Sequence, residues 1–119
     1  MDYDSGRDPD GVRVVLVTVP DQEAGRTLAR TVVEERLAAC GNVIPGLVSV
    51  YRWAGEIQED PEALVVFKTT EGALDRLMER VTELHSYDVP EFLALDVPKG
   101  HPPYLDWLIG EVAGGYDSR

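Results

Sequence analysis

The fold is decided by three consecutive stretches, Leu47-Val48-Ser49-Val50-Tyr51-Arg52-Trp53, Ala54-Gly55-Glu56 and Ala63-Leu64-Val65-Val66-Phe67-Lys68. The first and third are rich in β-branched and aromatic residues, which favour strands, and the glycine between them suits a tight reversal. They predict a long antiparallel hairpin. A run of small helical residues is expected to end just before it, at Gly41, and Pro45-Gly46 predicts a kink or bulge in its first strand.

Five further segments take their places around this hairpin. Hydrophobic periodicity and end signals predict strands at 12–19 and 91–97, and helices at 21–40, 70–84 and 102–112, with Thr70 as an N-cap and prolines in the first turn of the last helix. The order strand, helix, strand, strand, helix, strand predicts an α+β, ferredoxin-like βαββαβ sandwich with an extra C-terminal helix. We expect one domain over residues 12–113, a flexible, solvated tail over 1–11 and another tail over 114–119.

Both faces of the predicted strands are apolar. Since successive side chains point to opposite faces, Val14 and Leu16 lie opposite to Val15 and Val17, and the other strands repeat this pattern. Two helices can cover only one face, and a large exposed apolar face is a liability. The sequence therefore predicts a homo-oligomer that buries the second face. The alternative is that the C-terminal helix and tail cover that face alone.

The composition limits the partners. The chain has 22 acidic against 11 basic side chains, a formal charge of −11 and a pI near 4.4, so its field repels nucleic acid and anionic membranes. One cysteine cannot form an internal disulfide, and we see no basic, apolar leader and no apolar run near the roughly 20 residues of a membrane span. We expect a cytoplasmic protein without nucleic-acid or membrane partners.

Few side chains offer soft metal ligands. His85 and His101 are the only histidines and Cys40 is the only cysteine, and none lies at the ligand spacing of a zinc site. His85 follows a predicted helix C-terminus, where an imidazole can stabilise the helix dipole or serve as a ligand. Cys40, at the predicted end of the first long helix, fits a small buried hydrophobic residue. Acidic residues after the hairpin turn, Glu56, Glu59 and Asp60, lack the register of a calcium loop and are interpreted as a solvated face.

Five polar and aromatic residues predict a ligand cleft. Lys68 ends one apolar strand and Glu91 begins another, so the two can form an ion pair or flank a cleft. Tyr51, Trp53 and Tyr87 would supply its aromatic walls. The alternative is that Lys68 and Glu91 are a structural pair and that the aromatic residues belong to a core or an interface.

Five blocks of the sequence resemble a known family. They are Glu35-Arg36-Leu37-Ala38-Ala39-Cys40-Gly41-Asn42-Val43-Ile44-Pro45-Gly46, Tyr51-Arg52-Trp53-Ala54-Gly55, Phe67-Lys68-Thr69-Thr70, His85-Ser86-Tyr87-Asp88-Val89-Pro90-Glu91 and Tyr104-Leu105-Asp106-Trp107-Leu108. In this order they resemble the CutA family of divalent-cation tolerance proteins over residues 12–112. The resemblance implies a ferredoxin-like subunit, a homotrimer similar to that of the PII signalling proteins, and a link to copper and other divalent metals.

The resemblance is weakest at the metal ligands. Members that look like copper binders have a cysteine on the first strand and adjacent histidines before the Tyr-Pro-Glu region, where this chain has Val17 and Leu84-His85. Only His85 remains as a metal candidate, and a lone imidazole lacks the further soft ligands that hold copper tightly.

The main interpretation is a non-enzymatic homotrimer that takes part in divalent-cation (copper) tolerance. It would bind copper or another divalent cation weakly, through His85, and has no certain cofactor. The alternative is a PII-like signalling module that takes a small molecule or a protein partner at its subunit boundaries. A third hypothesis is an enzyme that uses Lys68 and Glu91. Phosphate-cradling glycines would favour the second hypothesis and a nucleophile paired with a base the third, and the sequence shows neither.

Overall fold

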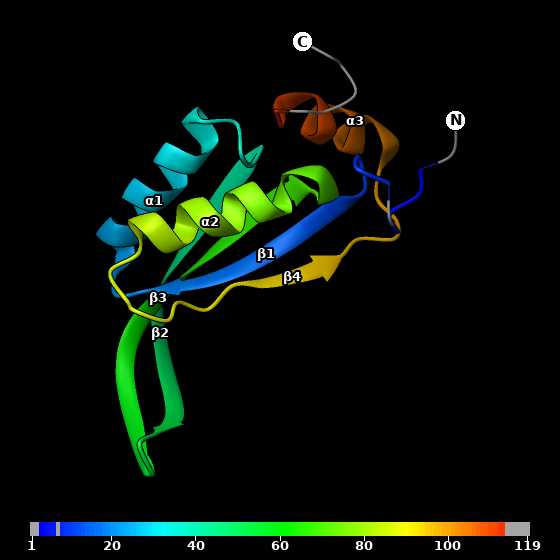
Figure 1. Ribbon diagram of the computed structural model, residues 1–119. Coiled ribbons are helices and arrows are strands. Elements are labelled where there is room, and N and C mark those ends of the chain that lie inside the picture. The colour runs from blue at the N-terminus through cyan, green and yellow to red at the C-terminus, as the bar shows by residue number, and fades with distance from the viewer. Residues whose placement is uncertain (1–2, 7, 114–119) are drawn as a thin grey trace.

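The computed structural model, which describes residues 3–6 and 8–113, is a four-stranded antiparallel sheet with two helices over one face and a third at one end (Figure 1). Its elements are β1 (Val12–Val19), α1 (Gln22–Glu34), β2 (Cys40–Trp53), β3 (Glu56–Thr70), a short 3₁₀ helix η1 (Glu71–Ala73), α2 (Leu74–Leu84), β4 (Leu93–Asp96) and α3 (Pro102–Glu111). The strand order is β2-β3-β1-β4. The predicted α+β, ferredoxin-like βαββαβ order with an extra C-terminal helix is confirmed. No helix among the described residues has the length and apolar character needed to cross a bilayer.

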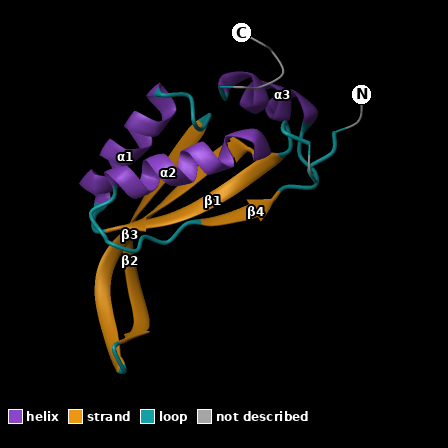
Figure 2. Ribbon diagram, viewed as in Figure 1, coloured by secondary structure: helices purple, strands orange, loops and turns teal. Residues whose placement is uncertain are grey.

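The face of the sheet beneath α1 and α2 forms the main core (Figure 2). In the central pair of strands Val15 lies opposite Phe67 and Val17 opposite Val65, and all four side chains have no exposed surface. They pack with apolar residues of both helices, namely Leu28, Ala29, Val32, Leu77 and Val81. These helical residues recur at intervals of three and four, so one stripe of each helix meets the sheet.

The alternate residues of the same strands lie on a face that no helix of the described chain covers (Figure 1). Its apolar members are Val14, Leu16, Ile44, Leu64, Val66, Leu93 and Leu95. Leu93 and Leu95 are 54% and 49% exposed. The helix α3 packs at one end of the sheet, against Val12, and leaves this helix-free face open. Strands that are apolar on both faces are therefore confirmed.

The hairpin of β2 and β3 extends well beyond the rest of the sheet (Figure 1). β1 ends opposite Ala63, so residues 47–62, here called the arm, continue as a two-stranded ribbon and stretch the molecule to 50 × 25 × 22 Å. The predicted irregularity is confirmed, because the register shifts between Ile44 and Leu47 and Gly46 has a φ of 80°. At the tip, Ala54 and Gly55 have φ values of 52° and 82°, which is the left-handed geometry of a tight hairpin turn.

The first helix ends earlier than its sequence pattern predicts. It stops at Glu34 rather than near Gly41, because Arg36 adopts a left-handed φ of 61° and the N–H groups of Arg36 and Leu37 bond back to Val33 and Val32. This is a Schellman cap with arginine in place of the usual glycine. Cys40 is consequently the first residue of β2, and its predicted place at a helix C-terminus is wrong.

Two other boundaries differ from the prediction. Thr70 is the N-cap of η1 rather than of α2, which begins at Leu74, and its side chain makes no capping hydrogen bond. β4 is limited to Leu93–Asp96, shorter than the predicted 91–97. The last helix begins with two prolines in its first turn as predicted.

Of the predicted tail 1–11, residues 3–6 and 8–11 are not free and solvated, while residues 1, 2 and 7 lie outside the described residues. Tyr3 packs against the apolar residues of α3, Ser5 is buried, and the carbonyl of Pro9 accepts a hydrogen bond from the N–H of Gly72. The other predicted tail, 114–119, lies outside the described residues.

Candidate functional site

Three of the five predicted cleft residues meet at the base of the arm. Tyr51 Oη donates to Asp60 Oδ2 at 2.5 Å, and Tyr87 Oη donates to Glu62 Oε2 at 2.7 Å. Glu91 is close enough to Glu62 to feel the charge of that carboxylate. Tyr51, Asp60, Glu62, Tyr87 and Glu91 are together called the arm-base cluster. It joins the arm to the loop between α2 and β4.

The strand register explains this convergence. Tyr51 pairs with Gln58 across the arm, and side chains two residues apart share a face, so Asp60 and Glu62 lie on the same side as the Tyr51 ring. The loop after α2 then places Tyr87 beside Glu62. The sequence analysis missed Asp60 and Glu62 as members of the site. The signal that could have found them was the alternation of the second hairpin strand opposite Tyr51.

Protonation in the cluster is shifted toward the neutral forms. Burial, and then the neighbouring Glu62, raise the pKa of Glu91. The hydrogen bond to Asp60 is the main cause that raises the pKa of Tyr51, whereas for Tyr87 the largest cause is burial, followed by the bond to Glu62. Both phenols therefore remain hydrogen-bond donors near neutral pH. None of the ion pairs found among the described residues involves Asp60, Glu62 or Glu91, so the cluster is electronegative.

The other two predicted cleft residues lie elsewhere. Lys68 pairs with Val14, whereas β4 begins only opposite Leu16, so Glu91 lies nearer the arm and the two charges do not meet. The Lys68 ammonium instead bonds to Asn42 Oδ1 and lies 4.0 Å from the sulfur of Cys40. Trp53 lies at the tip of the arm and is 64% exposed.

His85, the predicted metal ligand, uses both ring nitrogens within the chain. It caps the C-terminus of α2, its Nδ1 accepts from the N–H of Tyr87 at 3.1 Å, and its Nε2 lies 2.7 Å from the carbonyl oxygen of Thr18. Because Nδ1 accepts a hydrogen bond from the Tyr87 N–H, we assign the ring hydrogen to Nε2, which then donates a hydrogen bond to the carbonyl of Thr18. The imidazole therefore fixes the start of the 85–91 loop to the end of β1.

The donor atoms around His85 do not fit a tight copper site. Ligation would require the imidazole to give up one of its two hydrogen bonds. Among the described residues there is no group of three or more histidine, cysteine, aspartate or glutamate side chains that could hold a metal ion. The other histidine, His101, is exposed at the start of α3 and makes no capping bond through its side chain.

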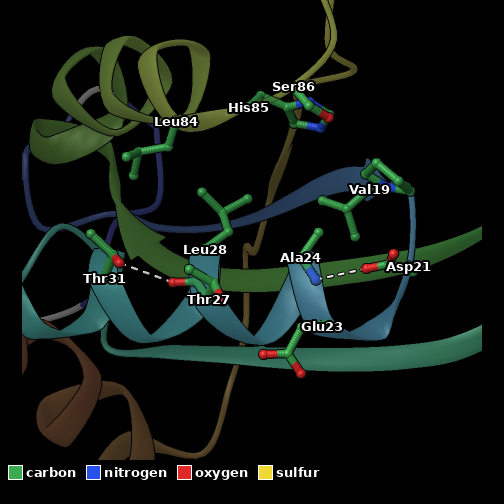
Figure 3. Close-up of a pocket in the computed structure, with 11 residues that line it drawn as sticks. Val19, Asp21, Glu23, Ala24, Thr27, Leu28, Thr31, Leu84, His85 and Ser86 are labelled. Carbon is green, nitrogen blue, oxygen red and sulfur yellow. Dashed lines mark hydrogen bonds between the residues drawn. The ribbon is translucent and has the colours of Figure 1, made fainter.

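A cavity of about 410 Å³ lies beside His85, between α1 and the end of α2 (Figure 3). Its walls are mostly apolar and include Val19, Leu28 and Leu84, and His85 and Ser86 lie at its edge. The sequence analysis did not find it, because its walls come from the end of β1, from α1 and from the end of α2 with the loop that follows, and the sequence alone does not specify how these pack. Its position shows that the two helices do not fully close over the sheet at this end.

Comparison with known proteins gives a consistent result. The family model described as CutA1 divalent ion tolerance protein matches residues 13–111. The "Divalent-cation tolerance protein CutA" of Thermus thermophilus is 57% identical over 95 residues, which cover 80% of this chain and 92% of that protein. "Protein CutA, chloroplastic" of Arabidopsis thaliana is 50% identical over 95 residues, with 80% of this chain and 52% of that protein covered, so the chain matches about half of its length. The crystal structure of CutA1 from Oryza sativa superposes with a TM-score of 0.86 at 47% identity and covers 87% of this chain and 95% of that one.

Proposed function

The chain belongs to the CutA1 family of divalent ion tolerance proteins, and from this we propose that it acts in tolerance to divalent cations, copper among them, as a non-enzymatic cytoplasmic homotrimer. The observation that carries the trimer is the helix-free face. Seven apolar residues from all four strands share it, and Ile44, Leu93 and Leu95 are each about half exposed. An uncovered apolar face of this extent favours burial against further copies of the chain.

The shape of the subunit supports a closed ring. The two edge strands, β2 and β4, differ in length and sequence, so a contact between unlike surfaces of neighbouring copies is natural, and such contacts form a ring when the rotation between copies closes. The arm projects beyond its own body and carries Val48, Val50 and Ile57, all at least 60% exposed. These side chains gain burial only if the arm reaches another copy.

Sedimentation of untagged protein over a wide dilution range tests the trimer. We expect one trimer-sized species and a melting temperature that falls on dilution, because folding and assembly are linked. Val66→Asp should dissociate or precipitate the protein, since it carries an unpaired charge into the interface. Thr27→Asp, which adds the same charge on the exposed side of α1, is the control. A compact monomer, or an intact Val66→Asp trimer of normal stability, would contradict the proposal.

Two features support the non-enzymatic part and the weak-metal part of the proposal. The Tyr51 and Tyr87 hydroxyls keep their protons because their pKa values are raised, so neither supplies a phenolate nucleophile near neutral pH. His85 offers a lone imidazole whose nitrogens already bond to the backbone, which favours weak rather than tight copper binding. The cytoplasmic location remains a prediction, and the Arabidopsis relative is named as chloroplastic.

The arm-base cluster favours a second candidate, a PII-like module that takes a ligand or a protein partner at a subunit boundary. Two phenol rings and three carboxylates at one place suit a cationic small molecule or a basic segment. In a trimer the exposed Trp53 of one arm could complete the cleft of a neighbouring copy. Glu62→Gln should then weaken binding of a cationic probe such as spermine in calorimetry, with Glu59→Gln as the control. Equal binding by the two variants would remove this candidate.

A further inference from the structure

The N-terminal segment, residues 3–6 and 8–11, precedes the part of the chain that matches the family and lies against the start of β1, η1 and α3. It is held by backbone as well as side-chain bonds. Gly11 O accepts from the N–H of Glu71 at 2.7 Å, and Pro9 O accepts from the N–H of Gly72 at 2.9 Å. Gly11 passes close to the earlier backbone of this segment, because a Cβ on Gly11 would lie 2.5 Å from the carbonyl oxygen of Ser5. Because these backbone hydrogen bonds hold residues 3–6 and 8–11 against the rest of the chain, we call this segment the strap.

Tyr3 places its hydroxyl where the ladder between β1 and β4 stops. Arg13 pairs with Asp96 in that ladder, so the next pair along it would be Val12 with Val97. Instead the Tyr3 hydroxyl accepts from the N–H of Val12 at 2.7 Å and donates to the carbonyl of Val97 at 2.7 Å. One phenol group thus replaces a rung of the sheet and satisfies both backbone groups.

Arg13, on β1, ties the strap to η1 and to the end of β4. This side chain is nearly buried, and its guanidinium bonds to the carbonyls of Val12 and Gly6 and forms ion pairs with Glu71 at 3.0 Å and Asp96 at 3.2 Å. A planar guanidinium with several donors is suited to such a junction. The strap, η1 and the end of β4 therefore share one buried cation.

The strap also closes a separate apolar cluster. The main core lies between the sheet and the helices α1 and α2, whereas α3 packs in a second cluster whose buried members are Val12, Ala73, Leu105, Leu108, Ile109 and Val112. Tyr3 packs against this second cluster from the strap side. At the other end of α3, Arg36 bonds to the carbonyls of Gly110 and Glu111. The helix is thus fastened by the strap at one end and by an arginine at the other.

We propose that the strap is a clamp: with Tyr3 docked, the end of β4 and α3 are ordered as one unit, and when Tyr3 leaves, that unit opens while the main core stays folded. Opening would expose the second cluster, including Val12 and Leu108, and would leave the helix-free face of the sheet unchanged. The observations behind the clamp all lie within one chain, so they rest neither on the proposed tolerance function nor on the trimer. The packing of α3 on the end of the sheet then depends on Tyr3, a residue far from α3 in the sequence.

Hydrogen exchange on the full-length protein tests the clamp, with Tyr3→Phe as the variant and Tyr104→Phe as the control. Both remove one phenol hydroxyl, but Tyr104 is exposed on α3 and packs only its ring, against Trp107. In Tyr3→Phe two partly buried backbone groups, the N–H of Val12 and the carbonyl of Val97, lose their partner, so we expect the amides of Leu108 and Ile109 to exchange about ten- to a hundredfold faster while those of α1 and α2 keep their rates. The test relies on the exchange rates of these α3 amides, because the Val12 amide would exchange faster simply by losing its own hydrogen-bond acceptor.

Two outcomes would overturn the clamp. If the α3 amides of Tyr3→Phe exchange as slowly as those of Tyr104→Phe, the strap is a surface attachment that does not control the helix. If every amide in Tyr3→Phe accelerates by the same factor, the strap contributes to global stability and no separate unit exists.

Discussion

The two faces of the central sheet are made by the same strands from similar residues, yet they differ in what covers them. Val17 on one face has no exposed surface, while Leu16 beside it remains partly exposed and Leu93, which pairs with Leu16 on β4, is 54% exposed. The difference lies in the helices, since α1 and α2 pack on one face only. The sequence pattern of a strand thus shows which of its faces are apolar. Whether a face is covered within the chain depends on how many helices are available to pack on it.

The largest expected effect comes from a substitution on the face of the sheet that α1 and α2 cover. Phe67→Ala removes a fully buried ring beneath both helices and should lower the free energy of unfolding by about 3–5 kcal/mol. On the helix-free face Val66→Ala removes fewer atoms from a partly exposed site, so its cost should appear mainly as weaker assembly. Denaturant unfolding at two protein concentrations separates the two effects.

The distinction between the two faces is contradicted if Phe67→Ala and Val66→Ala change the free energy of unfolding in the same way. A Phe67→Ala loss below about 1 kcal/mol would mean that the covered face is loosely packed. A Val66→Ala loss that is independent of protein concentration would mean that the helix-free face is buried within a single chain.

Sequence reasoning predicted most of the fold because the strands and helices carry local periodic patterns. The hairpin, β1 and the start of α3 follow directly from β-branched runs and from proline and glycine positions. The end of α1 could not be predicted in this way. Arg36 leaves the helical conformation and bonds to carbonyls of α3, 74 and 75 residues away in the chain, and no local pattern encodes such a contact.

The candidate site was predicted only in part, for a related reason. Glu91 stood out as a charged residue at the start of a predicted strand, and Tyr51 and Tyr87 as aromatic residues near it, and the structure gathers the three. Their partners Asp60 and Glu62 depend on the register of the arm, and the separation of Lys68 from Glu91 depends on where β4 begins along β1. Register is a pairwise property of two strands, so residue types alone do not determine it.

A smaller effect is expected where the arm leaves the covered part of the sheet. The pKa of Glu91 is raised in the folded state, first by burial and then by Glu62. The native state therefore binds more protons than the unfolded state between the two pKa values, and the stability from this group falls as pH rises through the folded value. At pH 7 Glu91→Gln should be more stable than the parent, by less than about 1 kcal/mol because solvent screens a partly exposed group.

The pH profile of thermal unfolding checks this sign. The advantage of Glu91→Gln should vanish below the ordinary glutamate pKa, since both side chains are then neutral. Glu59→Gln removes an exposed carboxylate from the other side of the arm and accounts for the change in net charge. If the two variants have the same profile, the neighbourhood of Glu62 imposes no specific cost on Glu91.

The smallest expected effect concerns copper at His85, which lies where the helix-covered side of the sheet ends. To bind a metal the imidazole must give up either the carbonyl of Thr18 or the N–H of Tyr87, and within the described part of the chain no group of three or more histidine, cysteine, aspartate or glutamate side chains is available to offset that loss. Calorimetry of untagged protein at neutral pH should therefore show weak binding with little heat. Most of that heat should disappear in His85→Ala and persist in His101→Ala, which removes an exposed imidazole at the start of α3. Tight binding by the parent, or equal heat from the parent and His85→Ala, would place the metal at another site and would show that the bonds of His85 to the backbone do not limit copper binding.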